Sequence, residues 1–161
     1  MIWHSAIYLA RDYDKAFFYM QKSLETEKEF AVGHYNLSEM YEITGKYDEA
    51  VAEWLKGMAF EEIDQADINI LETAYRGKDF RHFAQAKAAW LEKTRGDQDY
   101  ILATDIAKGY IGADDHEKAL ARLEIAYEER SPDLIFIGHS PAYDQLRSEP
   151  RFLAILKKMN F

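Results

Sequence analysis

Apolar residues recur along the chain at the spacing of amphipathic helices. Leu37, Met40 and Tyr41 mark one helical face, and Gly45 follows as a break. A second face follows at steps of three and four residues, formed by Tyr47, Ala50, Val51, Trp54 and Met58. The pattern predicts a helix, a tight turn and a second helix, each helix about 14 residues and roughly 21 Å long. Because such a pair cannot bury its apolar stripe alone, we expect neighbouring pairs to stack on one another.

The same pattern repeats with a period of 34 or 35 residues. The recurring alanines are Ala16, Ala50, Ala84 and Ala119, at spacings of 34, 34 and 35. Two further series, Tyr41, Tyr75 and Tyr110, and Leu37, Leu71 and Ile106, follow at spacings of 34 and 35. We expect the alanines to lie where paired helices approach most closely, and overfilling such a contact costs roughly 1–3 kcal/mol. Ala50→Leu should therefore destabilise the fold more than Glu53→Leu, which we expect to be a surface change.

The last 31 residues differ in character, because all three prolines lie there, at positions 132, 141 and 150. The first two prolines predict the starts of two short segments, 133–137 and 142–147. Ser148 is placed to cap a last helix that has Pro150 in its first turn. The apolar stripe of this helix consists of Phe152, Ile155, Leu156 and Met159. Since a stack of helix pairs exposes an apolar face at its end, we expect this helix to act as a terminal cap.

The second unit resembles the tetratricopeptide repeat, a helix pair with large and small residues in a fixed order. The residues that carry the resemblance are His34, Leu37, Ser38, Tyr41, Gly45, Tyr47, Ala50, Trp54 and Gly57. The first and fourth units follow the same order in part. In the third unit Ala88 and Leu91 replace the usual aromatic and small residue. We therefore expect the second helix of the third unit, roughly 80–93, to be rotated or displaced.

The resemblance implies an all-α chain that forms a right-handed α-solenoid of about four helix pairs with a C-terminal helical cap. The expected array covers residues 1–130, in units of about 1–30, 31–64, 65–98 and 99–130. Residues 131–161 are expected to form capping helices within the same domain.

The tail carries a narrower resemblance. Residues 127–132 (YEERSP) and 144–152 (DQLRSEPRF) look like the segment that closes the C-terminal tetratricopeptide arrays of bacterial winged-helix regulators, adenylate cyclases and Ser/Thr protein kinases. This implies a non-catalytic scaffold for a protein or peptide, serving as a regulatory or sensory module of a bacterial signalling or transcription-regulatory protein. The alternative is a small-ligand effector sensor, with a pocket between the concave face and the C-terminal cap near Tyr110, Phe136 and Tyr143.

In this family the first helices of successive units line a concave face that binds the partner. The positions that carry over to this chain are Ser5, Tyr8, Tyr35, Asn36, Glu39, Glu42, Asn69, Thr73, Arg76, Thr104, Asp105, Lys108 and Ile111. The two tyrosines would supply amphipathic contact area, and the two asparagines would hold a peptide backbone. The competing interpretation is that these side chains are only the solvated polar positions of a scaffold.

Charge argues against nucleic acid as the partner. The chain has 20 Lys and Arg against 29 Asp and Glu, a net charge of −9. Proteins that bind phosphate backbones need a basic face. The basic residues around the third turn are Arg76, Lys78, Arg81, His82 and Lys87, and Asp79 interrupts them. We expect no nucleic-acid partner and no direct insertion into a membrane, because no apolar run approaches the length of a membrane span.

No motif points to catalysis, a metal or a cofactor. The chain has no cysteine, and its histidines (His4, His34, His82, His116 and His139) lack the spacing that puts two imidazoles on one ion. Asp114 and Glu117 have the spacing of a helix capping box. We therefore expect no enzyme, no cofactor and no metal site.

The first helix begins about three residues late relative to the repeat motif, which leaves Ile2, Trp3 and Ile7 without a cap. Either the chain is cut from a longer one, or it forms a homodimer through these uncapped N-terminal helices. Without a signal pattern we expect a cytoplasmic protein, or a periplasmic one if the chain belongs to a membrane-anchored parent.

Overall fold

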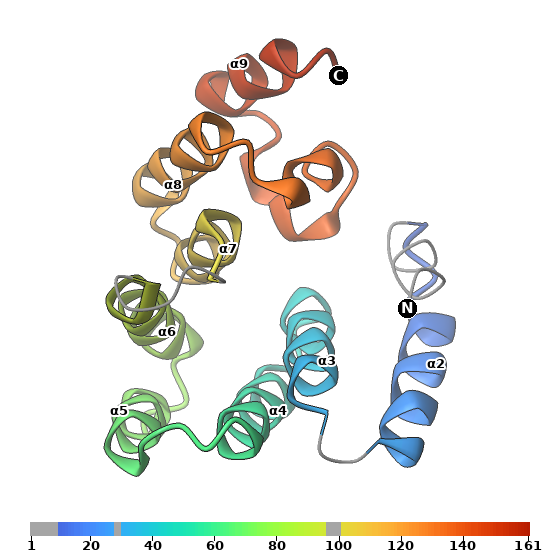
Figure 1. Cartoon of the computed structure of the whole chain (residues 1–161), viewed down its shortest axis with the longest axis vertical. Helices are drawn as coiled ribbons and strands as arrows, with labels where there is room; N and C mark the ends of the chain where they lie inside the picture. The colour runs from blue at the N-terminus through green and yellow to red at the C-terminus, as the bar shows by residue number, and fades with distance from the viewer. Residues whose placement is uncertain (1–9, 28–29, 96–100) are drawn as a thin grey trace. The chain divides into compact units, whose positions relative to one another are not determined.

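The computed structural model describes residues 10–27, 30–95 and 101–161, and this part of the chain is helical and contains no strand. The α-helices are α2 (Tyr13–Thr26), α3 (Ala31–Ile43), α4 (Tyr47–Phe60), α5 (Gln65–Tyr75), α6 (Phe80–Arg95), α7 (Ala103–Gly112), α8 (His116–Glu128) and α9 (Pro150–Lys158) (Figure 1). Two short 3₁₀ helices, η1 (Pro132–Phe136) and η2 (Pro141–Leu146), precede α9. The predicted all-α class is confirmed for these residues.

The chain forms two compact units, Met1–Lys78 (unit 1) and Asp79–Phe161 (unit 2). The division falls at the turn between α5 and α6. It therefore lies inside the helix pair expected over 65–98, so that α5 belongs to unit 1 and α6 to unit 2.

In unit 1, α3 and α4 form a tightly packed antiparallel pair joined by a turn at Gly45, whose φ of +74° suits glycine. The small residues of the repeat pattern lie at the contact between the two helices. The Ser38 hydroxyl donates a hydrogen bond of 2.7 Å to the Ala50 carbonyl, and Ala50 is fully buried. At Gly57 a Cβ atom would lie 2.5 Å from Cε1 of Tyr35. The small residues of the repeat pattern thus lie where α3 and α4 approach closely, as the sequence predicts.

Glu53 differs from the expectation that it lies on the surface. Its Oε2 lies 2.6 Å from Nδ1 of His34, and its side chain is only 13% exposed. The imidazole of His34 also stacks on the ring of Phe60, with centroids 5.1 Å apart. A Glu53→Leu change would therefore break a largely buried polar pair, so this position is a poor surface control for Ala50→Leu.

The other helices of unit 1 pack on this pair through aromatic side chains. Phe17 of α2 lies 4.8 Å from Tyr41 of α3, measured between ring centroids. Tyr75, at the end of α5, donates a hydrogen bond of 2.7 Å to Asp48 in the first turn of α4. The recurring Ala16 on α2 is buried, like Ala50.

In unit 2, α7 packs against both α6 and α8. A Cβ atom at Gly109 of α7 would lie 3.0 Å from Cβ and 3.2 Å from Cα of Ala88 on α6. Ala88 thus stands where the repeat pattern has an aromatic residue because α6 and α7 approach too closely for a ring. The recurring alanines Ala84 and Ala119 are fully buried.

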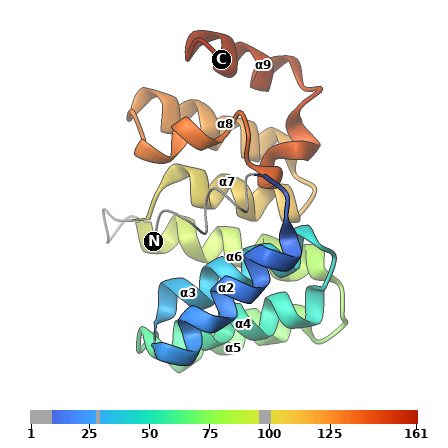
Figure 2. The ribbon, with the colours of Figure 1, turned by 90° about the vertical axis from the view of Figure 1, so that its right-hand side faces the viewer.

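The C-terminal segments complete unit 2. η2 packs on α7, and α9 packs on α8, which makes α9 the last layer of this unit (Figure 2). The starts predicted at Pro132 and Pro141 are confirmed. On α9, Phe152 and Ile155 are buried, and the ring of Phe152 stacks on Tyr143 of η2 at 6.2 Å. η2 and α9 therefore cover α7 and α8, as expected of a cap.

Two predicted helix caps are wrong by one residue. Glu149, and not Ser148, precedes α9, and its side chain makes no capping hydrogen bond. Asp115, and not Asp114, caps α8, by accepting a hydrogen bond from the Lys118 amide at 3.2 Å. Asp114 has a φ of +62° and closes the preceding turn instead. In both places the turn is one residue longer than the sequence pattern predicts, so the helix begins one residue later.

Candidate interaction surface

The side chains predicted to contact a partner differ widely in exposure. On α3, Asn36 is exposed and Glu39 and Glu42 are partly buried. On α5, Asn69 and Thr73 are exposed, and Arg76 directly after the helix is exposed too. Ser5 and Tyr8 lie outside the described residues. Four residues of the predicted set in unit 1 are therefore exposed to solvent, one on α3 and three on or directly after α5.

Tyr35 is held by its own helix pair. Its ring lies 4.5 Å from Trp54, measured between centroids, and covers the bare backbone of Gly57. Its hydroxyl donates a hydrogen bond of 2.8 Å to Glu61. These three contacts fix the ring against α4. Tyr35 thus has a packing role that its repeat position alone does not reveal. Its side chain is only partly exposed, so it offers a partner less contact area than the sequence predicts.

The end of α5 is clamped to α4 beside the exposed residues of α5. Asp48 accepts hydrogen bonds from the Tyr75 hydroxyl at 2.7 Å and from Lys78 Nζ at 2.6 Å. Lys78 and Tyr75 together lower the pKa of Asp48. Burial, reinforced by Asp48, raises the pKa of Tyr75 to about 12. This clamp positions α5, and with it Asn69 and Thr73, relative to α4.

On α7 the predicted surface is largely absent. Thr104 and Ile111 are buried, and Asp105 and Lys108 are half-buried and form an ion pair at 3.1 Å. Within the described part of the chain, the Thr104 hydroxyl has no hydrogen-bond partner. η2 packs on α7, which the family positions do not indicate. Only Asp105 and Lys108 remain as contact residues on this helix.

The three aromatic residues named for an effector pocket have different environments. Tyr110 and Tyr143 are buried, whereas Phe136 is 41% exposed. Tyr110 hydrogen-bonds Glu92, and Lys118 Nζ lies 5.1 Å from its ring centroid. Burial, with Glu92, raises the pKa of Tyr110 to about 12. Tyr110 is therefore part of the packing among α6, α7 and α8.

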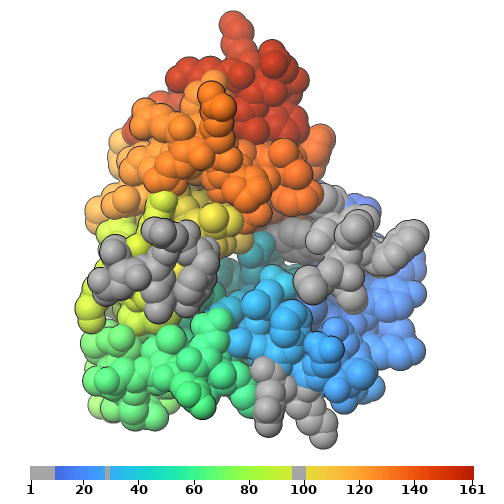
Figure 3. Space-filling view, in the orientation of Figure 1, coloured from blue at the N-terminus to red at the C-terminus, as the bar shows by residue number. Residues whose placement is uncertain are grey.

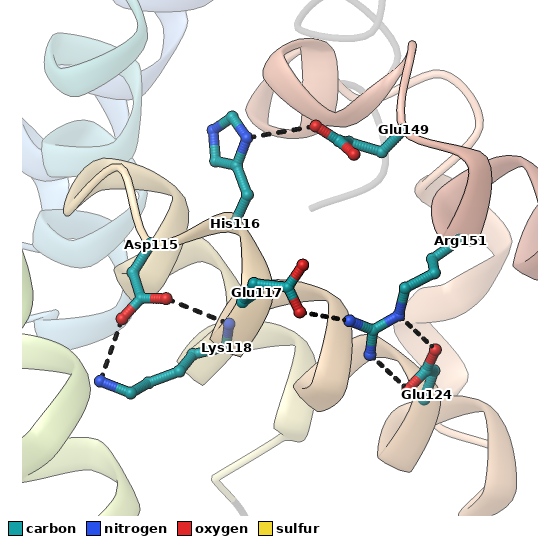
Figure 4. Close-up of polar contacts among 7 residues, drawn as sticks. All are labelled: Asp115, His116, Glu117, Lys118, Glu124, Glu149 and Arg151. Carbon is teal, nitrogen blue, oxygen red and sulfur yellow. Dashed lines mark hydrogen bonds and ion pairs between the residues drawn. The ribbon is translucent and has the colours of Figure 1, made fainter.

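A polar cluster that the sequence did not indicate fastens α9 to α8 (Figure 4). Nε and Nη2 of Arg151 donate to the two carboxylate oxygens of Glu124 at 3.0 and 2.8 Å, and Nη1 donates to Glu117 at 2.7 Å. Arg151 lowers the pKa of Glu124. His116 lies 3.6 Å from Glu149 at the start of α9. The fork geometry of Arg151 sets the direction of α9, so the cluster has a structural role.

Four of the five basic residues around the third turn are paired or buried, and Arg76 is exposed. Lys78 is paired with Asp48 in unit 1. In unit 2, Arg81 lies 3.7 Å from Asp114, His82 lies 3.5 Å from Asp79, and Lys87 is buried.

Neither metal ligands nor a membrane span emerge from the described residues. Across 10–27, 30–95 and 101–161, no three His, Asp or Glu side chains are grouped so that they could hold a metal ion. Among the helices of these same ranges, none has both the length and the apolar character needed to cross a membrane.

Comparison with known proteins finds no matching family model, no matching curated protein and no matching solved structure.

Proposed function

We propose that this chain is a non-catalytic scaffold of the tetratricopeptide type, which binds a protein or a peptide through the exposed residues of α3 and α5. We further propose that it serves as a regulatory or sensory module in a bacterial signalling or transcription-regulatory protein. The first proposal rests on residues of unit 1, and the second rests on the likeness of the tail to closing segments of such arrays.

The observation that carries the binding proposal is a correspondence between two helices. Glu39 and Thr73, and likewise Glu42 and Arg76, occupy equivalent positions 34 residues apart. Their helices, α3 and α5, both pack on α4. Asn69 is exposed near the middle of α5 and accepts a hydrogen bond from Gln65 at 3.1 Å. Amides can both donate to and accept from a peptide backbone, which makes exposed Asn36 and Asn69 suitable for an extended segment.

The test uses a defined set of ligands. Peptides selected from a random phage-displayed library on the intact chain are titrated against a variant with Asn36→Ala and Asn69→Ala. We expect the dissociation constant to rise about tenfold, which corresponds to about 1.4 kcal/mol. The matched control carries Gln21→Ala and Glu25→Ala on exposed positions of α2. Equal affinity of both double variants for the selected peptides would contradict the proposal.

A second candidate is the small-ligand sensor, and one feature of unit 2 favours it. Buried hydroxyls normally find a partner, and an unsatisfied one costs roughly 1–3 kcal/mol. Thr104 and Ser131 are buried, and neither hydroxyl has a hydrogen-bond partner within the described ranges. A metabolite screen by thermal shift tests this candidate: a genuine effector should stabilise the native chain and lose its effect in Thr104→Val.

A further inference from the structure

The outer face of α9 does not have the character of a solvated end. Phe152 and Ile155 point into unit 2, so the opposite side of the helix contains Leu153, Ala154 and Lys157. The side chain of Leu153 is 50% exposed, and Ala154 and Lys157 are also exposed. Terminal elements of stacked helical folds normally need a polar outer face for solubility. Here the outermost layer of unit 2 presents an apolar strip beside a cation. Figure 3 shows the atoms of the C-terminal end of the chain, in red, at the surface.

The charge of this helix is opposite to that of the rest of the chain. Residues 150–161 contain three basic residues and no acidic one, in a chain whose net charge is −9. Arg151 is occupied by Glu117 and Glu124, and Lys158 lies 5.5 Å from the ring centroid of Tyr127. Lys157, the third of these basic residues, is exposed on the outer face. A surface of this kind fits a partner that combines carboxylates with an exposed apolar side chain.

Unit 1 has that combination. Residues 30–78 contain four basic and ten acidic residues, a net charge of −6. At the end of α4, Phe60 is 41% exposed and is followed by Glu61 and Glu62, both exposed. Phe60 would contact Leu153 and Ala154, while Glu62 would pair with Lys157.

We propose that the outer face of α9 (Leu153, Ala154 and Lys157) docks on the acidic end of α4 (Phe60, Glu61 and Glu62) of a second copy of this chain. The two surfaces are different, so the contact is head-to-tail: in a pair, one copy keeps a free α4 end and the other keeps a free α9 face, and further copies can add at both. This differs from a symmetric homodimer through the N-terminal helices. One helix face makes a small interface, and we expect weak association, with a dissociation constant on the order of 100 µM.

Sedimentation equilibrium of the full chain tests the proposal. We expect the average mass to rise continuously with concentration from the monomer value of 18.8 kDa and to pass that of a dimer. Raising the salt from about 50 mM to about 500 mM should weaken the association, because the contact is partly electrostatic. Lys157→Glu should weaken it about tenfold or more. Lys22→Glu, the same charge change on an exposed position of α2, should leave it unaltered.

Mixing two variants with reversed charges provides the decisive experiment. Lys157→Glu and Glu62→Lys should each associate poorly alone, and an equimolar mixture of the two should recover association, because each variant keeps one native surface. A chain that stays monomeric at every concentration overturns the proposal and leaves a different acidic protein as the occupant of α9. Association that stops at a dimer, or that ignores Lys157→Glu, overturns it in favour of the N-terminal contact.

Discussion

The contact between Tyr35 and Gly57 gives the sharpest test of the packing in unit 1. A methyl group at position 57 would lie 2.5 Å from Cε1 and 2.8 Å from Cδ1 of the Tyr35 ring. The ring has little freedom to move away, because Trp54 lies on it and Glu61 holds its hydroxyl. Gly57→Ala must therefore displace a restrained aromatic side chain or separate α3 from α4.

The size of the effect follows from two opposing contributions. An added methyl group in a filled contact costs roughly 1–3 kcal/mol. Alanine is favoured over glycine within a helix by about 1 kcal/mol. Gly57→Ala should therefore lower the free energy of unfolding by up to about 2 kcal/mol in the native chain. With Tyr35→Ala as the background the clash is gone, and the same change should raise that free energy by about 1 kcal/mol.

The assay is urea unfolding of the four members of this double-mutant cycle, followed by circular dichroism and by tryptophan fluorescence, since Trp54 adjoins the site. Gly77→Ala serves as the control, because no atom lies within 4 Å of a Cβ placed there. If Gly57→Ala changes the stability by the same amount with and without the Tyr35 ring, the two residues do not make the contact described.

Three further predictions concern unit 2. Gly109→Val should destabilise the chain by roughly 1–3 kcal/mol in urea unfolding, because its side chain would meet the backbone of Ala88 on a neighbouring buried helix. The pKa of Tyr110 is raised to about 12 from an ordinary value of about 10. The contribution of Tyr110 to stability should therefore be complete below about pH 10 and disappear as the pH rises to about 12. Tyr110→Phe should abolish this loss of stability in unfolding curves measured at alkaline pH. Because Arg151 lowers the pKa of Glu124 in the folded chain, the stability from this pair should be present above about pH 4.5 and fall as the carboxylate is protonated. Arg151→Gln should remove this acid dependence, at a cost of less than about 1 kcal/mol since both side chains are partly exposed.

The repeat pattern predicts local structure well because each of its residues suits the backbone conformation or the helix contact at its own position. Gly45 adopts the positive φ that the tight turn needs, and the recurring alanine Ala50 lies at the closest approach of two helices. The prolines at 132 and 141 begin the short helices of the cap, since a proline at the first helical position needs no hydrogen-bond partner. Such requirements can be read from neighbours in the chain.

Contacts between distant residues could not be read in this way. Glu53 follows the spacing of a surface residue, yet it forms a largely buried pair with His34, 19 positions earlier. Thr104 holds a repeat position that faces the partner in the resembling family, but it is buried in unit 2, where η2 packs on α7. The repeat positions therefore agree with the observed exposure at Asn69 and Thr73 on α5 but not at Thr104 on α7.

Helix periodicity and backbone preferences act over a few residues, so the helical class, the turn after α3, the buried register of small residues and the starts of the capping segments follow from the amino-acid sequence. Three features became visible only in the folded chain: the division at the turn after α5, the packing of Tyr35 on Gly57 and Trp54, and the contact by which Arg151 holds the last helix. These outcomes depend on which side chains meet across helices far apart in the chain, and a period of 34 residues does not encode the fit of one particular ring or guanidinium.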